Sequence, residues 1–320
     1  MAAPCFLLTA VVLALAGTLL AEPPKLPQNQ PTKAQITLGE DLFFDGRLSI
    51  DGSVSCAACH DPTLAFSDDR PRSRGFNGRF SRRHSMPLFN LASKPAFFWD
   101  GRAGTLREQV LEPIQDHREM AARLPSVLYR LNRNQDYRRR FRKHFGADPI
   151  RVDDLAQALA IYCASLTSFD SKWDRVQEKK ATFTSLEEKG RRLFFTEPAA
   201  PTPGAGCFRC HNAPLFTDHK FRFNGVMEKG DLGRFEVTGQ ESDRFKVMTP
   251  SLRNLRLTAP YMHNGSLPDL NAVLDHYAKE QKPHPNLAPE LRVPLILSTS
   301  DREALKAFFL TLTGKEMAFE

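Results

Sequence analysis

Residues 56–60 read Cys-Ala-Ala-Cys-His, and residues 207–211 read Cys-Phe-Arg-Cys-His. Each stretch has the form of a c-type haem attachment motif, in which two thiols bond to the porphyrin and the adjacent histidine ligates the iron. The short spacing lets both thiols and the imidazole reach one flat macrocycle. Two such motifs predict two c-type haems and a role in electron transfer or oxidative chemistry. The predicted haem-binding residues are Cys56, Cys59, Cys207 and Cys210 as attachment points, with His60 and His211 as proximal iron ligands.

Other interpretations of these cysteines explain less. Two CxxC pairs can hold zinc, but here they stand about 150 residues apart, unlike a compact zinc module. A thioredoxin-like redox pair leaves both histidines unexplained. Of the other two cysteines, Cys5 lies in an N-terminal apolar segment and Cys163 in the apolar run 159–164. We therefore expect no structural disulfide in the mature chain.

The N-terminal segment predicts export. Residues 6–20 are almost wholly apolar, and the run breaks at Ala21-Glu22-Pro23-Pro24. This pattern is typical of a secretory signal peptide, here residues 1–21, and it predicts a periplasmic or secreted protein. The alternative is an uncleaved membrane anchor, because about 20 apolar residues can span a bilayer. Only in that case would the membrane be a partner.

The chain has a net charge of +7, and much of the excess lies in residues 130–143. A nucleic-acid site is a poor interpretation for an exported haem protein, so we predict no nucleic-acid partner. A solvated basic helix face is the simplest alternative. A docking surface for an acidic redox partner is the third.

Hydrophobic periodicity predicts a mainly α fold with long loops. Helices are expected over 37–44, 105–112, 121–132, 134–145, 152–168, 185–195 and 300–312, with a capping box that starts at Ser185. Residues 61–98 lack periodicity and predict an ordered loop around the first haem. A Gly followed by Leu-Phe-Phe precedes each CxxCH, in 39–44 and 190–195. This repeat predicts two cytochrome c-like helical domains, residues 22–168 and 169–320, each holding one haem.

Several longer stretches resemble the bacterial di-haem cytochrome c peroxidase superfamily, which includes MauG. They are LFFDGRLS (42–49), FFWDGRAGTLREQVLEPIQ (97–115), LRNLRLTAPYMHNGSL (252–267) and LTGK (312–315), in an order that covers nearly all of the mature chain. The resemblance implies a peroxidatic first haem, an electron-transfer second haem and a calcium ion between the domains.

Three residues gain roles from the resemblance. Glu119 matches the catalytic glutamate of the family, and Gln109 matches the distal glutamine that orients peroxide. A carboxylate above the iron can take a proton from one peroxide oxygen and give it to the other. Trp99 matches the tryptophan between the two haems, which implies an electron relay, although a tryptophan is more often a core residue. By contrast, Glu108 and Glu112 are out of register and are interpreted as surface charges.

The sequence departs from the typical peroxidase near the first haem. Phe76 stands where a displaceable histidine ligand is expected, so we predict an open, five-coordinate iron. His84 is the only other candidate ligand in this loop. It also replaces an asparagine that binds calcium in the family. Calcium is therefore in doubt, although the backbone carbonyls of Thr258 and Pro260 could still hold it.

A second departure concerns the second haem, where Tyr277 replaces a methionine ligand and resembles MauG. A phenolate favours higher iron oxidation states, whereas methionine raises the reduction potential. The alternative is a buried tyrosine that packs on the haem edge. Met248 and Met262 are out of register as ligands.

Together these features predict a MauG-like peroxidase or oxidase that uses hydrogen peroxide at the first haem. Its substrate could be a partner protein, and the resemblance implies oxidation of tryptophan side chains there. The first alternative is a peroxidase that removes hydrogen peroxide with electrons from a small redox protein. The second is a non-catalytic electron carrier.

Overall fold

The computed structural model describes residues 30–199 and 204–314. The expected signal peptide (1–21) and Cys5 lie outside these residues. The helices are α1 (Lys33–Phe43), α2 (Leu106–Gln109), α3 (Glu112–Gln115), α4 (Leu124–Arg133), α5 (Gln135–Phe145), α6 (Val152–Ser165), α7 (Lys172–Gln177), α8 (Ser185–Phe195), α9 (Phe235–Thr238), α10 (Leu270–Ala278) and α11 (Thr299–Leu310). The strands β1 (Phe221–Arg222) and β2 (Val247–Met248) form one short antiparallel pair. The prediction of a mainly helical chain with long loops is confirmed.

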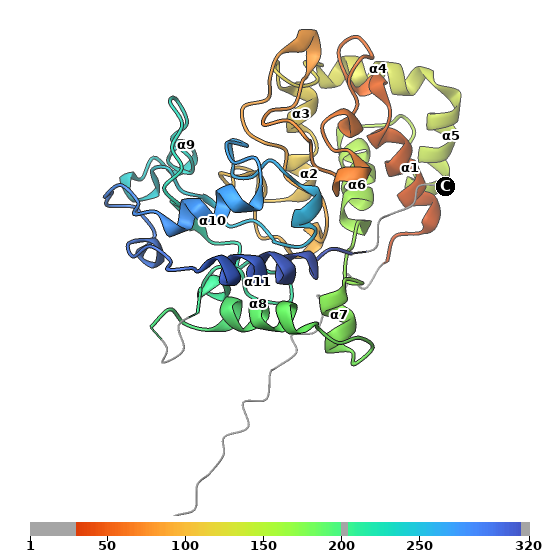
Figure 1. Ribbon diagram of the computed structural model, residues 1–320. Helices are drawn as coiled ribbons and strands as arrows, with labels where there is room; N and C mark the ends of the chain where they lie inside the picture. Colours follow the sequence, from red (N-terminus) through yellow and green to blue (C-terminus); the bar gives the residue numbers. More distant parts are fainter. Residues whose placement is uncertain (1–29, 200–203, 315–320) are drawn as a thin grey trace, which may run out of the picture.

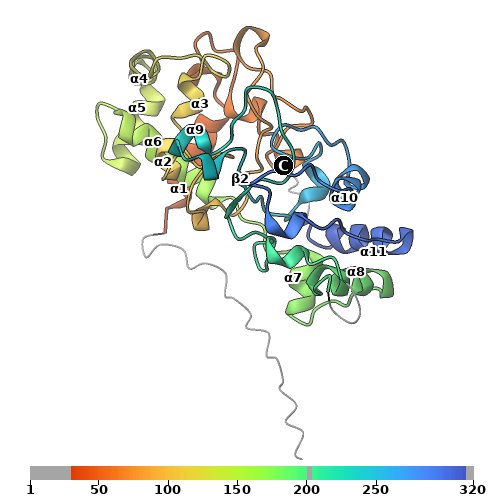
Figure 2. The same cartoon turned by 90° about the vertical axis from the view of Figure 1, so that its left-hand side faces the viewer.

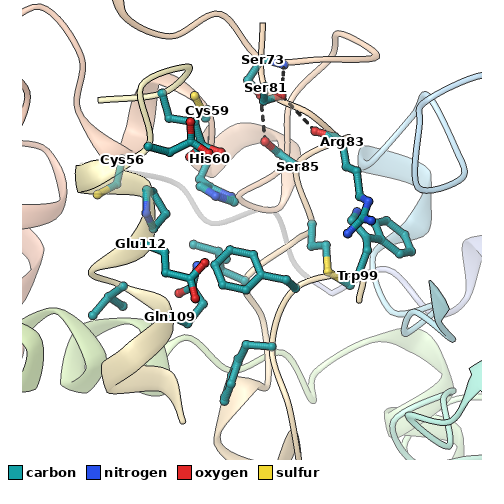
Figure 3. Close-up of a pocket in the computed structure, with 18 of the residues that line it drawn as sticks. Cys56, Cys59, His60, Ser73, Ser81, Arg83, Ser85, Trp99, Gln109 and Glu112 are labelled. Atoms are coloured by element: carbon teal, nitrogen blue, oxygen red, sulfur yellow. Dashed lines mark hydrogen bonds between the residues drawn. The ribbon is translucent and has the colours of Figure 1, made fainter. Parts of the chain in front are cut away.

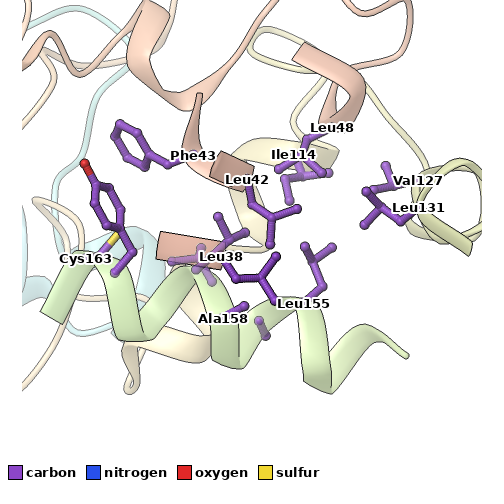
Figure 4. Close-up of a cluster of buried hydrophobic side chains, with 14 of the residues drawn as sticks. Leu38, Leu42, Phe43, Leu48, Ile114, Val127, Leu131, Leu155, Ala158 and Cys163 are labelled. Carbon is purple, nitrogen blue, oxygen red and sulfur yellow. The ribbon is translucent and has the colours of Figure 1, made fainter. Parts of the chain in front are cut away.

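One hydrophobic core lies among α1, α3, α4, α5 and α6 (Figure 4). Its helices bury apolar residues at helical spacing, as Leu38 and Leu42 do on α1. Leu155 and Leu159 meet them from α6. All members of this cluster lie between residues 38 and 166.

A second core forms where α8 packs along α11, and the two helices lie side by side in both views (Figures 1 and 2). Aromatic rings dominate it. Phe194 and Phe308 lie 5.2 Å apart between ring centroids, and Trp173 lies 5.7 Å from Phe308. All members of this cluster lie between residues 173 and 312. Apolar contact therefore gathers into two centres, one for each CxxCH motif.

The repeated glycines lie at equivalent helix crossings. A Cβ on Gly39 would lie 2.2 Å from the backbone oxygen of Ala158 on α6, and a Cβ on Gly190 would lie 1.9 Å from that of Ala304 on α11. Only glycine allows such close approach of two helix backbones. The likeness of 39–44 and 190–195 therefore reflects the same packing in both halves.

Several helix boundaries differ from the predictions, for local reasons. The capping box of α8 is Thr184 with Glu187, one residue before the expected Ser185, because Thr184 is the last extended residue. The first helix begins at Lys33 because Thr32 and Gln35 form an earlier box. The 105–112 pattern divides into α2 and α3, since Pro113 has no N–H to continue the helix.

Two further expectations concern longer segments. Residues 61–98 form the expected ordered loop, with only short 3-10 turns at 62–64, 76–78 and 91–93. Among residues 30–199 and 204–314, no helix combines the length and the apolar character that crossing a bilayer requires.

Candidate functional site

The first CxxCH motif forms a tight turn at the wall of a cavity. Residues 56–58 are a single 3-10 turn, and the His60 N–H donates to the Cys56 carbonyl at 3.0 Å. Cys56, Cys59 and His60 all line one cavity of about 510 Å³ (Figure 3). Its volume is in the range of small-molecule and cofactor sites.

The His60 imidazole is fixed with one nitrogen free. Its Nδ1–H donates to the Phe66 carbonyl at 2.8 Å, which leaves Nε2 to ligate a metal. Phe66 has a φ of 58°, and this left-handed residue turns the chain back so that its carbonyl faces the ring. A hydrogen bond of this kind commonly orients a metal-ligating histidine.

The second motif repeats this arrangement. Residues 207–209 form a 3-10 turn, and His211 Nδ1 lies 3.1 Å from the carbonyls of both Phe216 and Pro250. Phe216 is also left-handed, with a φ of 54°. Both histidines therefore fit the proximal role that the motifs predict. No three or more His, Cys, Asp or Glu side chains converge as a metal cluster within the described residues, so the two CxxC pairs do not form one zinc site there.

The first cavity also fits the body of a haem. Its walls include the apolar side chains Phe43, Val54, Leu88, Leu91, Phe97, Val110 and Leu159. Lys94 lies at the same cavity, and burial lowers its pKa to about 8. Lys94 has no carboxylate partner among the described residues, which suits it to a haem carboxylate.

Glu119 and Gln109 line the same cavity as His60. Burial raises the pKa of Glu119 to about 7, assisted by the negative charge of Asp116 and opposed by Arg102. Figure 3 shows Gln109 at the cavity together with His60 and Trp99. The Gln109 amide has no hydrogen-bond partner among the described residues. The structure thus brings Glu119, Gln109 and Trp99, the three side chains to which the resemblance assigns roles, to one cavity.

The backbone of Glu119 is held by the loop in which Phe76 lies. The Phe76 N–H donates to the Glu119 carbonyl at 2.6 Å, and a Cβ on Gly75 would lie 2.1 Å from the Arg118 oxygen. The Phe76 side chain is not among those that line the cavity. The loop therefore supports the backbone of Glu119, whose side chain lines the same cavity as His60.

Trp99 lies at the junction of the two halves. Its indole N–H donates to the His84 carbonyl at 2.8 Å, and its own carbonyl accepts from the Met248 N–H at 2.7 Å. The His263 ring lies edge-on, 6.4 Å away between centroids. The indole is buried, with 7% exposed, and it also lines the first cavity.

Tyr277, on α10, lies beside the second motif. Its pKa is raised to about 12, mainly by burial and also by the nearby Cys210 and Cys207, while a hydrogen bond with Asn224 opposes this shift. Asn224 also donates to the Met262 sulfur at 3.3 Å. The Tyr277 oxygen thus lies near the second pair of cysteines and shares Asn224 with the Met262 thioether, whereas Met248 is buried in β2.

The hydrogen bonds of His84 do not favour a role as an iron ligand. Its Nδ1–H donates to the Arg70 carbonyl at 3.0 Å, and its Nε2 lies 3.4 Å from the Ser67 hydroxyl. The Thr258 carbonyl also acts on this ring. Calcium requires six to eight oxygen ligands, and an imidazole is not among the donors it prefers. The donor set at Thr258 and His84 therefore does not fit the calcium ion that the resemblance implies.

Some residues at the site carry no sequence signal. Glu112, interpreted as a surface charge, has a side chain that is 39% exposed, and it also lines the cavity and accepts from Arg102 Nε at 2.6 Å. Glu108 instead completes the capping box of α2. Arg83 pairs with Asp100 at 2.6 Å and with Asp231 at 2.7 Å, which links the two halves beside Trp99. No local pattern predicts a pair 148 residues apart.

Comparison with known proteins agrees with this geometry. The family model for di-haem cytochrome c peroxidases matches residues 33–182. The methylamine utilization protein MauG of Methylorubrum extorquens is 39% identical over 294 residues, which cover 91% of this chain and 81% of MauG. The cytochrome c551 peroxidase of Nitrosomonas europaea is 30% identical, with 97% of this chain and 90% of the relative covered.

A solved structure shows the same fold. The crystal structure of a MauG-like protein associated with microbial copper homeostasis superposes with a TM-score of 0.81 at 29% identity, covering 92% of this chain and 93% of the other. Membership of this family implies two c-type haems and activity on peroxide. The chain belongs to the di-haem cytochrome c peroxidase and MauG family of peroxide-acting oxidoreductases.

Proposed function

We propose that this enzyme uses hydrogen peroxide at an open first haem in the manner of MauG, and oxidises side chains of a partner protein. The observation that carries the proposal is that Glu119 and Gln109 line the cavity onto which His60 opens. Phe76 cannot ligate iron, and the His84 ring, although it borders the cavity, is engaged in hydrogen bonds with Ser67 and Arg70. The distal side of the first site is therefore available to peroxide.

The side chains can move the protons that peroxide cleavage requires. As a carboxylate, Glu119 takes a proton from the oxygen nearer the iron and returns it to the departing oxygen. Because its pKa is about 7, it can exchange a proton in both directions at neutral pH. The free Gln109 amide holds the peroxide in line. When bound, the haem supplies the iron at which the O–O bond breaks.

The second half is proposed to store and pass on oxidising equivalents. Tyr277 is the proposed distal ligand of the second haem, supported by its position beside Cys207 and Cys210. Trp99 is the proposed relay, supported by its contacts with segments of both halves. The proposed domains are residues 22–168 and 169–320, and two separate apolar cores support this division. The proposed location is the periplasm or the cell exterior.

A second candidate is a peroxidase that removes hydrogen peroxide with electrons from a small redox protein. The similarity to the cytochrome c551 peroxidase over 97% of this chain favours it. A non-catalytic carrier is disfavoured, because a carrier has no use for a buried carboxyl with a raised pKa in its haem cavity.

Spectroscopy and product mapping test the proposal. The holoenzyme as isolated should contain one high-spin haem and should react with peroxide without prior reduction. A first haem that is low-spin with two strong ligands would overturn it. Incubation with peroxide and candidate exported proteins, followed by mass spectrometry, should locate oxidised tryptophans on one partner. Rapid turnover with a small cytochrome or copper protein and no oxidised residues would instead favour the second candidate.

A further inference from the structure

His84 lies where the two halves of the chain meet. The residue is 6% exposed, its backbone N–H donates to the His263 carbonyl at 2.8 Å, and its carbonyl accepts from Trp99. The halves approach closely at this place, since a Cβ on Gly265 would lie 2.4 Å from the Cα of Pro71. The imidazole therefore fills a tightly packed junction and is not a surface group.

Oxygen atoms from both halves face the His84 ring. The first half provides the Arg70 carbonyl, 3.0 Å from Nδ1, and the Ser67 hydroxyl, 3.4 Å from Nε2. The Ser67 hydroxyl donates its own proton to the Ser85 carbonyl at 2.7 Å, so it presents a lone pair to the ring. The second half provides the Thr258 carbonyl; burial lowers the pKa of His84, and the Thr258 and Arg70 carbonyls both oppose that shift.

Converging oxygens of this kind suit a cation or a hydrogen-bond donor. Calcium would need six to eight oxygens at about 2.3–2.6 Å, and the imidazole provides a nitrogen and a ring of carbon atoms instead. A donor N–H at the same place satisfies the carbonyl of Arg70 directly. The imidazole thus holds a facing oxygen atom by hydrogen bonding, as a calcium ion would hold it by charge.

We propose that the His84 imidazole replaces the calcium ion that the family resemblance implies, so that the halves of this chain are joined without calcium. The Thr258 carbonyl then belongs to a junction that the His84 side chain fills. This inference concerns the assembly of the chain, and it stands whether or not the proposed function is right.

Metal analysis of the purified holoprotein tests the inference directly. The protein, prepared without chelators and dialysed against metal-free buffer, should contain far less than one calcium per chain. Its Tm and the absorption spectrum of its haems should not change with either EGTA or millimolar calcium chloride. A calcium ion bound at roughly a hundredfold excess over its Kd would raise the Tm by several degrees. About one calcium per chain, or a lower Tm in EGTA, would overturn the inference.

A substitution identifies the residue responsible. His84→Asn removes the imidazole and adds an amide oxygen, so its Tm should be low in EGTA and rise with calcium. His144→Asn is the matched control, because His144 lies on α5, far along the chain from this junction, and it should show no response to calcium. A His84→Asn protein that ignores calcium would also overturn the inference. If that variant does not accumulate, the calcium content and EGTA response of the wild type decide the question.

Discussion

Glu119 is the residue whose environment most directly sets the conditions for activity. Burial raises its pKa to about 7, so the carboxylate that accepts a proton predominates only above neutrality. The rate of peroxide cleavage should therefore rise with pH through about 7 and level off above it. Glu119→Gln should lower the rate by about 10²–10⁴-fold and remove this inflection. Stopped-flow mixing with peroxide measures both effects. Glu108→Gln is the control, and an unchanged pH profile in Glu119→Gln would contradict the assignment.

Tyr277 gives a spectroscopic prediction that does not depend on turnover. If its oxygen ligates the second haem, Tyr277→Phe should change the absorption and electron paramagnetic resonance spectra of that haem alone. Tyr261→Phe is a matched control, since Tyr261 is also half-buried in the second half but donates to the Leu255 carbonyl at 2.8 Å. Identical spectra for wild type and Tyr277→Phe would rule out ligation and favour simple packing on the haem edge.

Lys94 gives a third prediction at this scale. If Lys94 pairs with a carboxylate of the first haem, its positive charge favours the reduced iron, because repulsion between the two positive charges is weaker after reduction. Lys94→Gln should make reduction of the first haem less favourable by on the order of 1 kcal/mol. Potentiometric titration followed by absorption measures this, with the exposed Lys33→Gln as the control. An equal shift in both variants would show that the effect is one of net charge only.

At the scale of elements, the two halves reuse one helix crossing before each haem motif. Gly190 on α8 lies against the Ala304 carbonyl of α11, so Gly190→Ala forces the helices apart and should destabilise the fold by about 1–3 kcal/mol. Urea denaturation followed by the second haem's absorption measures it. Gly104→Ala is the control, because its nearest neighbour would lie 3.6 Å away in a flexible side chain. Equal midpoints for the two variants would show that the crossing can relax.

The elements also show what a sequence can predict. Periodicity locates α4, α5, α6, α8 and α11 to within a few residues, because each has a continuous apolar face. The same reasoning misses the break between α2 and α3, which depends on one missing N–H at Pro113. The loop 61–98 is long but ordered, since its backbone donates hydrogen bonds to the carbonyls of Glu119, Leu166 and His263.

At the scale of the whole molecule, the sequence predicts the parts of the site better than the contacts between them. The motifs identify His60 and His211, and the resemblance identifies Glu119. Nothing local predicts that Glu112 lines the cavity, and the contact of the His84 ring with Thr258 across the junction follows only from the family resemblance. These contacts join residues far apart in the chain, so they depend on how the two halves pack.

The ion pairs of Arg83 are the clearest example of such packing and give the last prediction. Arg83 joins Asp100, next to Trp99, to Asp231 of the other half, and all three side chains are buried. Burial alone would raise the pKa of Asp231, but the hydrogen bonds and charge of Arg83 hold it well below its usual range. A depressed carboxyl pKa stabilises the fold fully above the unfolded value, near 4, and this stability is lost as the pH falls below it.

Asp231→Asn should therefore destabilise the protein by about 3–5 kcal/mol at neutral pH, because it leaves Arg83 buried with one partner fewer. In the wild type, the urea midpoint should fall as the pH is lowered from neutrality to the most acidic pH at which the haems are retained. In Asp231→Asn this fall should be smaller. Asp136→Asn, which breaks the exposed pair with Arg139, should cost less than about 1 kcal/mol and leave that fall unchanged.

Since Asp100 adjoins Trp99, a loosened junction should also slow electron transfer between the haems, measured by flash reduction. If Asp231→Asn lowers stability but leaves that rate intact, the ion pairs hold the halves together without positioning the relay.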